Sequence, residues 1–472
     1  MNISANTTST PSFTGAKIWL VSIFFIALTG CASTSVFTPY PSQVQSAKSA
    51  LGNNAESESV LKNLESKKDT ADAMLYMMES SRVAQLSEQF ERSKNNANQV
   101  INAFEKQDLQ ATVRLSDVGA KSGSLLTNEN AIPYSGAGYE RIFIHHQQAL
   151  NYWAQNDIEG ASVEFRKVAL EQRVLSERYE DEIAKAHSEA QQNNIDIASI
   201  SQEFSGLDEI AGSVKSSFLS PYTYYTSAAF WEAIGEYNNA LIDYKLALEI
   251  VPNSQSIQAD IRRVSAQLGG SSSGETNSPK DNEGSIVILY EQGFIPERTE
   301  FALSIPNFYD GGIISVAFPF YANTESWSRP TLLSIRDDQF VDYGETFPLT
   351  DYGTLAVKNL KEQLPSLIVR QVLRGFAKHE LQKQSADSGG ALGLFVANIY
   401  SIISERADLR SWLTLPRSGQ ALRVNLPSGQ RTLAFRTESK SVELDVDIRK
   451  GKTNFIRIVN VNNRLITQVL PL

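Results

Sequence analysis

The sequence predicts an α+β protein with more than one domain: an N-terminal α-helical domain built from tetratricopeptide-like repeats, then a C-terminal antiparallel β-rich domain with inserted helices. Apolar residues recur at helical spacing through the first half of the chain, and their period changes to two beyond residue 285. A stretch rich in glycine, serine and other polar residues, 269–284, separates the halves. This composition is typical of a flexible linker.

Residues 1–30 are predicted to form a secretory signal peptide. Lys17 precedes eleven residues, 18–28, of which only Ser22 is polar. This apolar core is too short for a membrane span, which needs about 20 residues, but it has the length of a signal core.

The only cysteine of the chain, Cys31, follows the signal and is the candidate lipidation site. Leu28-Thr29-Gly30-Cys31 resembles the bacterial lipobox, which implies that this cysteine becomes an acylated N-terminus. Several acyl chains anchor a protein firmly, whereas one alone binds a membrane marginally. By the same resemblance, Ala32 rather than Asp after the cysteine implies attachment to the outer membrane. The alternative is an ordinary cleaved signal with an incidental cysteine.

Composition excludes several classes of function. The chain has 472 residues and a net charge of −10, and we expect no nucleic-acid partner because phosphate-backbone binding needs clustered Lys and Arg. Acylation of Cys31 would leave no thiol for a disulfide or a thiolate metal site. No cofactor is expected.

Residues 31–59 are small and polar and are expected to form a lipidated tether, with the helical repeat domain at 60–268. The clearest repeat is 224–252, where small and aromatic residues stand at spacings that resemble the tetratricopeptide repeat: Ala228, Trp231, Gly235, Tyr237, Ala240, Tyr244, Ala247 and Pro252. The same offsets recur at 149–168 and more weakly at 81–100. A plain helical bundle is the alternative, because these signatures are degenerate.

Three further helices are expected around the repeats. Residues 163–194 read as one long, charge-rich helix, 195–217 as a second helix, and 254–268 as a helix that caps the array.

The β-rich domain is expected at 285–472. Alternating apolar residues predict strands at 286–290, 301–305, 313–321, 332–335, 422–426, 432–435, 442–448, 455–459 and 465–470. Helices are predicted at 354–384 and 391–405, with Pro365 starting a new helix at its first position. Residues 389–400 are apolar on nearly all sides, and we expect them to be buried against the sheet. A segment that dips into the membrane is the alternative.

The order of these features resembles a family of periplasm-facing bacterial lipoproteins that have degenerate tetratricopeptide repeats followed by a β-rich domain. The resemblance covers most of the mature chain and is carried by Tyr139-Glu140-Arg141 with His145, Ala149-Leu150-Asn151-Tyr152 with Asp157, Gly235 to Ala240, Leu289 to Gly293, and Val316 to Pro319. It implies an architecture and an envelope role. It implies no catalytic residues, because the family has no established activity.

Candidate partner-binding residues lie on the first helices of the repeat pairs, which are expected to line a concave face. Glu140 and Arg141 could clamp a peptide or a carboxylate there, or they could cap a helix and pair with neighbours. Aromatic residues of the repeats serve packing first, and one or two of them could face the groove. The candidate set is Tyr139, Glu140, Arg141, His145, Tyr152, Tyr224 and Trp231.

The sequence offers little for catalysis or metal binding. It has four histidines and no HExxH, Walker-type or G-x-S-x-G pattern. His145 and His146 would point about 100° apart on a helix, so no metal site is expected there. Asp337, Asp338 and Asp342 lack the spacing of a calcium loop, and a solvated turn is expected.

Together these observations favour a lipid-anchored scaffold, not an enzyme, on the periplasmic side of the outer membrane. It would bind periplasmic or outer-membrane proteins through the repeat groove, and tethering would raise their effective concentration. The alternative is a regulator of peptidoglycan synthesis that contacts a cell-wall synthase. A hydrolase of envelope polymers is disfavoured because no nucleophile and base set is apparent.

Overall fold

The structure is a computed structural model that describes residues 38–114, 130, 133–212, 214–270, 276–306, 313–322, 330–404 and 406–472. Within these ranges it contains 13 helices and three sheets, which confirms the α+β class. The predicted signal peptide and Cys31 lie outside the described residues. Among the described helices, none combines the length and the apolar character that a membrane span requires.

The first described helices lie where the tether was expected to continue to residue 59. They are α2 (Tyr40–Gln43), α3 (Gln45–Ala50) and α4 (Asn54–Glu65). Tyr40, Val44, Ala47 and Ala50 are buried, because apolar residues three and four apart form one helix face. Because two of these four residues are alanines, the segment has the small-residue composition that is typical of a tether. The spacing of three and four residues is what indicates the helices.

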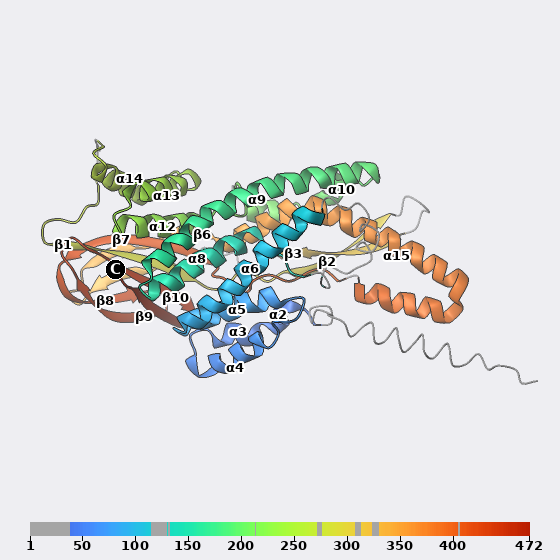
Figure 1. Cartoon of the computed structure of the whole chain (residues 1–472), viewed down its shortest axis with the longest axis horizontal. Coiled ribbons are helices and arrows are strands. Elements are labelled where there is room, and N and C mark those ends of the chain that lie inside the picture. The colour runs from blue at the N-terminus through green and yellow to red at the C-terminus, as the bar shows by residue number, and fades with distance from the viewer. Residues whose placement is uncertain are drawn as a thin grey trace, which may run out of the picture.

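Three helix pairs follow, each joined by a short turn (Figure 1). They are α5 (Ala73–Leu86) with α6 (Phe90–Arg114), α8 (Gly138–Ala154) with α9 (Ile158–Gln192), and α12 (Pro221–Ala233) with α13 (Tyr237–Ile250). Helix α14 (Gln255–Gln267) packs on α13, as the sequence predicts for residues 254–268.

The three turns have the same geometry. In each, the residue two positions after the first helix has a positive φ: Glu88 (60°), Asn156 (60°) and Gly235 (83°). The next N–H donates to the carbonyl five residues earlier, at 2.9, 2.9 and 2.8 Å. This is the hydrogen bond of a Schellman helix end, and it returns the chain so that the second helix packs on the first.

The predicted long helix is confirmed as α9, but a single helix over 195–217 is wrong. The segment forms two short helices instead, α10 (Ile197–Gln202) and α11 (Gly206–Ala211). Gly212, with φ of 53°, ends α11, because a left-handed residue stops a helix and favours glycine.

The largest sheet has five strands in the order β11-β10-β1-β7-β6. Their bounds are β1 (Glu283–Gln292), β6 (Phe347–Asp351), β7 (Ser418–Pro427), β10 (Thr453–Val461) and β11 (Arg464–Leu470). Strands β1 and β10 are parallel, whereas the other described pairs of this sheet are antiparallel. The expected purely antiparallel arrangement is therefore corrected at β1, which begins the domain but pairs with a strand near its end.

Two smaller sheets complete the β part. One has the order β5-β4-β8-β9 and comprises β4 (Ser334–Asp337), β5 (Asp342–Glu345), β8 (Gly429–Arg436) and β9 (Ser441–Ile448). The other is a hairpin of β2 (Thr299–Pro306) and β3 (Ile313–Phe320). The strands predicted by alternation are all present, whereas β5 and β6 were missed.

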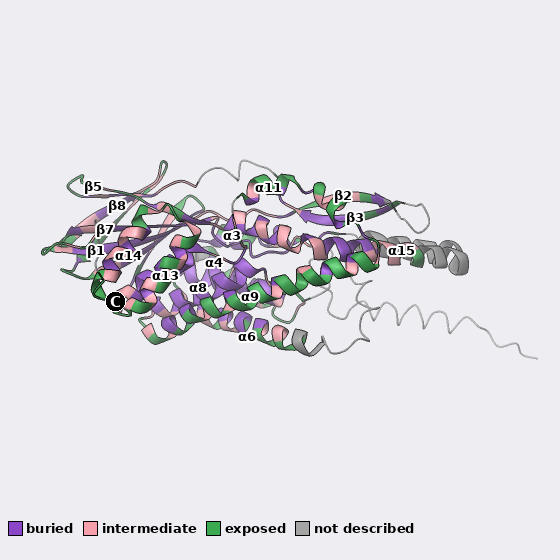
Figure 2. Cartoon of the chain, turned by 90° about the horizontal axis from the view of Figure 1, so that it is seen from above, coloured by how far each residue is buried: buried purple, intermediate pink, exposed green. Residues whose placement is uncertain are grey.

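The five-stranded sheet is the middle of three layers. Ile286, Ile288 and Tyr290 of β1 pack against the four-stranded sheet, whereas Val287 and Leu289 pack towards the helices. Both faces of β1 are therefore buried, as Figure 2 shows by colour. One apolar cluster joins residues of the helical half to residues of the β half, so the core has no break at 269–284. The division into two domains stays a prediction.

Helix α15 (Tyr352–Ser404) is one helix, where the sequence predicted two and a new start at Pro365. The proline lies inside the helix, and a buried stripe continues past it through Leu360, Leu364, Ile368 and Val372. Packing on both sides of the proline thus outweighs the lost backbone hydrogen bond. The side chains of residues 389–400 lie outside the described set, so their burial stays a prediction.

Candidate functional site

Most of the candidate partner-binding residues are buried. Tyr139, Glu140, Arg141, His145, Tyr224 and Trp231 lie in the interior, and Tyr152 is half-buried.

Glu140 caps helix α8. Its Oε2 accepts the Ala137 N–H at 2.8 Å and the Tyr134 hydroxyl at 2.5 Å, and its Oε1 accepts the Trp412 N–H at 2.7 Å. Burial raises the pKa of Glu140 in spite of these donors. Its carboxylate is thus used within the fold, in the capping role that the sequence left open as the alternative to clamping a ligand.

Arg141 and His145 are paired as well. The Arg141 guanidinium lies 2.5 Å from Asp108 Oδ2, and it also bonds Glu171. Nδ1 of His145 lies 2.7 Å from Glu164 Oε2.

The aromatic candidates stabilise contacts between helices. The Tyr224 hydroxyl donates to Gln172, and Trp231 Nε1 donates to Asp243 Oδ2 at 3.0 Å. The Lys94 ammonium lies 5.4 Å from the centre of the Tyr152 ring. All seven candidates thus have partners within the chain.

Helices α8 and α12 pack against the middle sheet (Figure 1), and α5 reaches it through Arg82, which pairs with Glu291 of β1. On α8, Trp153 meets Phe455 of β10 edge to face with ring centres 4.7 Å apart, and its Nε1 donates to the Pro471 carbonyl. On α12, the Tyr222 ring covers Gly419 of β7. The face on which a partner was expected is therefore occupied by the protein's own sheet.

His146 lies among the rings of Phe143, Phe165 and Tyr222. It is fully buried, and neither ring nitrogen has a hydrogen-bond partner among the described residues. Burial, with smaller effects of neighbouring charges, lowers its pKa to about 3. The imidazole is therefore neutral at physiological pH.

The acidic positions considered for calcium belong to a turn. Asp337 Oδ1 accepts the N–H groups of Gln339 and Val341, at 3.0 and 2.9 Å, and Oδ2 accepts the Tyr343 hydroxyl. Within the described residues, no group of three or more His, Cys, Asp or Glu side chains is placed to hold a metal ion.

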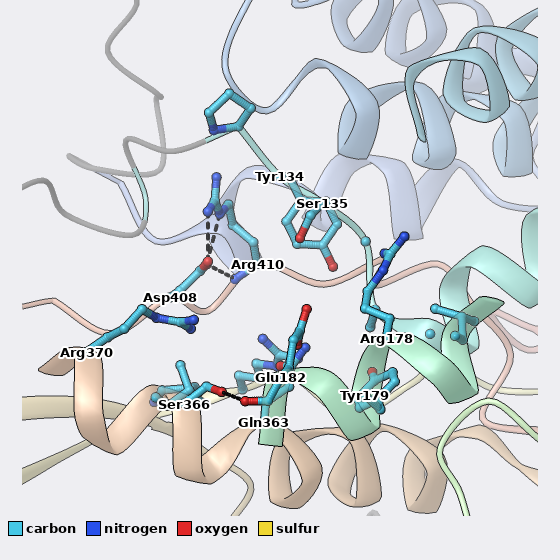
Figure 3. A pocket seen from close by; sticks show the side chains of 18 residues that line it. Tyr134, Ser135, Arg178, Tyr179, Glu182, Gln363, Ser366, Arg370, Asp408 and Arg410 are labelled. Atoms are coloured by element: carbon cyan, nitrogen blue, oxygen red, sulfur yellow. Dashed lines mark hydrogen bonds and ion pairs between the residues drawn. The ribbon is translucent and has the colours of Figure 1, made fainter. Parts of the chain in front are cut away.

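A cavity of about 290 Å³ lies where α8 begins, between α9, α15 and the segment before β7 (Figure 3). Four arginines line it together with two acidic residues, namely Arg178, Arg298, Arg370 and Arg410 with Glu182 and Asp408. This site is not predicted from the sequence. Its arginines are 40 or more positions apart along the chain, and no local pattern marks them.

Two of these arginines have carboxylate partners. Arg410 bonds Asp408 at 2.8 Å and Asp72 at 2.7 Å, as Figure 3 shows for Asp408, and Arg178 bonds Asp108 at 2.6 Å. Arg370 lies at the exposed rim.

Arg298 differs from them. It is 8% exposed, and its one hydrogen bond among the described residues runs from Nε to the Tyr321 hydroxyl at 3.2 Å. The cavity is thus the strongest candidate site, because it contains a buried cation that has no ion-pair partner among the described residues.

A larger cavity of about 580 Å³ lies between α13, α14 and the middle sheet, and its two buried arginines, Arg263 and Arg423, are paired with carboxylates. Arg263 lies 2.7 Å from Glu232 Oε1, and Arg423 lies 2.8 Å from Glu232 Oε2. Arg263 also pairs with Asp260 at 2.6 Å.

Comparisons of the chain with protein-family models, with curated proteins and with solved structures find no match.

Proposed function

We propose that the protein is a lipid-anchored scaffold of the outer membrane that faces the periplasm and holds partner proteins on the outer surfaces of its helices. The lipobox-like sequence that ends at Cys31 supports the anchor. The proposal assigns the protein no catalytic activity.

We infer that the three helix pairs are tetratricopeptide-like repeats. The support is the repeated turn at Glu88, Asn156 and Gly235, with the same left-handed residue and the same hydrogen bond in each pair. A plain bundle would not require three turns of one geometry.

The proposed binding mode rests on the packing of the middle sheet against the first helices of the helix pairs. Because Trp153 and Tyr222 contact β10 and β7, the repeat groove is filled from within the chain. Partner proteins must then use other surfaces.

Helix α9 offers such a surface. Val163, Leu170 and Val174 are exposed, and their spacings of seven and four residues place them on one face of the helix. Helix α9 extends along the outside of the molecule, as Figure 1 shows. We propose that this stripe contacts a protein of the envelope.

The anchor is tested with a Cys31→Ser variant. We expect the parent chain in the membrane fraction with acyl groups detectable by mass spectrometry, and the variant in the soluble fraction. Equal membrane retention of both, with no lipid on the parent, would reject the anchor.

The binding mode is tested with a photo-cross-linking residue at Leu170 in intact cells. Ser176 is the matched control, because it is exposed on the same helix but outside the apolar stripe. We expect one reproducible protein adduct at Leu170 and none at Ser176. A cell-wall synthase in that adduct would favour the regulatory alternative, and identical adducts at both positions would reject the stripe.

A further inference from the structure

Arg298 is an unusual buried cation. It immediately precedes β2 and lies against Tyr321, with its guanidinium carbon 6.0 Å from the ring centre. Nε donates to the Tyr321 hydroxyl, which fixes the plane of the guanidinium. Tyr321 is itself 1% exposed, so the arginine is held by a rigid neighbour.

The Nη groups of this guanidinium have no hydrogen-bond partner among the described residues. An arginine has five N–H donors, and in the described part of the chain only the Nε donor of Arg298 has a partner. No carboxylate of the described residues forms an ion pair with Arg298. In the same cavity, Arg178 pairs with one carboxylate and Arg410 with two. Glu140 and Asp408 lie near enough to interact with the charge of Arg298 but form no ion pair with it, so a bound anion could neutralise this cation directly.

The surroundings of Arg298 favour an anion. The side chain lines the cavity and its Nε faces Tyr321, so we take its Nη groups as the donors available to a ligand there. Four arginines and two acidic residues line the cavity, and Asp72 and Asp108 pair with Arg410 and Arg178. Arg298 is thus a buried arginine of the lining whose charge no described ion pair offsets. The cavity also borders the beginning of α8, where the helix dipole is positive.

The size of the cavity limits the ligand. A volume of about 290 Å³ is at the small end of ligand pockets and cannot hold a folded partner or a long peptide. Ser135 and Arg370 are exposed at the rim, so a small molecule has access from solvent.

We propose that this cavity binds a small anion through a carboxylate or phosphate group, which accepts two N–H bonds from the Nη atoms of Arg298. A guanidinium is planar and presents parallel N–H donors that match the two oxygens of either group. Arg370 at the rim adds long-range attraction. This proposal does not depend on the proposed protein-binding stripe of α9, and the two can be tested separately.

The test uses the full chain purified in detergent and titrated by calorimetry with two probes, inorganic phosphate and succinate. We expect saturable one-to-one binding of at least one probe, weakened by added salt. The preferred probe identifies the source of the oxyanion. Absence of binding by both probes at millimolar concentration would overturn the proposal.

Three variants locate the site. Arg298→Gln should weaken binding about tenfold to a hundredfold, because charge-assisted hydrogen bonds are lost. Arg298→Lys should recover only part of the affinity, because an ammonium keeps the charge but not the paired donors. Arg336→Gln, which removes a half-exposed arginine on β4, is the control and should bind as the parent does.

A fourth variant covers the possibility that the Arg298 variants do not fold. Ser135→Asp places a negative charge at the exposed rim without altering the core, and it should weaken binding severalfold while circular dichroism stays unchanged. Parent-like affinity in Ser135→Asp, or in a folded Arg298→Gln, would overturn the assignment of this cavity.

Discussion

Glu291 of β1 and Arg82 of α5 form an ion pair of 2.5 Å across the boundary between the helices and the middle sheet. Both side chains are buried, and Arg457 of β10 bonds the same carboxylate at 2.8 Å. Burial alone would raise the pKa of Glu291, but the two guanidinium groups hold that pKa far below its usual range. The Glu291 carboxylate thus neutralises one cation from the helices, Arg82, and one from the middle sheet, Arg457.

Replacing Glu291 should destabilise the whole protein. Glu291→Gln leaves two buried guanidinium groups without a counter-charge, and we expect a loss of about 3–5 kcal/mol in the free energy of unfolding. Urea denaturation followed by circular dichroism measures it. The control is Asp342→Asn, which removes an exposed pair with Arg336 at 3.7 Å and should change stability by less than about 1 kcal/mol. Equal effects of both variants would contradict a structural role of the buried pair.

Gly419 of β7 tests the contact between the repeat face and the sheet. A Cβ at this position would lie well inside van der Waals contact with the Tyr222 ring of α12. We expect Gly419→Ala to lower the free energy of unfolding by about 1–3 kcal/mol, because the crowded ring must shift. Gly206→Ala is the matched control, since no atom lies within 4 Å of its added Cβ. A parent-like Gly419→Ala would mean that α12 does not cover the strand.

Part of this architecture follows from the sequence. In β9, Val446 and Ile448 face the core and alternate with polar residues that face solvent. This alternation predicts a half-buried strand. The helix pairs follow from the spacing of small and aromatic residues. Pairings far apart in sequence do not follow: Val287 lies beside Phe455 because β1 and β10 are parallel, and no local pattern encodes that register.

The candidate site was less predictable for a related reason. Aromatic residues on the first helices, such as Trp153 and Tyr222, look the same in sequence whether they face a partner or the protein's own sheet, because both environments are apolar. The cavity at Arg298 depends on side chains from separate elements. Its distinguishing feature is that Arg298 forms no ion pair with a carboxylate of the described residues, and this can be seen only when its neighbours in space are known.

Glu79 should make stability fall as pH rises towards neutrality. Its carboxylate accepts the N–H groups of Leu413 and Thr414, at 2.8 and 3.1 Å, and burial raises its pKa from 4.5 to about 7. The folded state then holds a proton that the unfolded chain releases above pH 4.5. The contribution of this proton to stability is present at low pH and is lost as pH rises through 7.

We expect Glu79→Gln to remove this slope. Between pH 5 and 7.5 the difference in free energy of unfolding between parent and variant should shift by about 2–3 kcal/mol, in favour of the variant at the higher pH. Thermal or urea unfolding across that range measures it. Parallel pH profiles would show that Glu79 is ionised in the fold.

His146 should produce the opposite dependence on pH. Its pKa is lowered from 6.5 to about 3, chiefly by burial, so the folded state keeps the imidazole neutral while the unfolded chain binds a proton below pH 6.5. Stability from this group is therefore complete above pH 6.5 and is lost as pH falls towards 3. Each pH unit in that window contributes a loss of up to about 1.4 kcal/mol.

His146→Leu separates this effect from acid denaturation in general. Leucine has a volume similar to that of histidine and removes two ring nitrogens that have no partner among the described residues, so stability at pH 7.5 should be unchanged or higher. Between pH 6 and 4 the variant should lose less stability than the parent, measured by urea unfolding at each pH. His187→Leu on the surface of α9 is the control, and it should follow the parent profile because that histidine is exposed. If His146→Leu also followed the parent profile, the imidazole would have to be hydrated or protonated within the fold, and the aromatic cluster of Phe143, Phe165 and Tyr222 would have to open to water at acid pH.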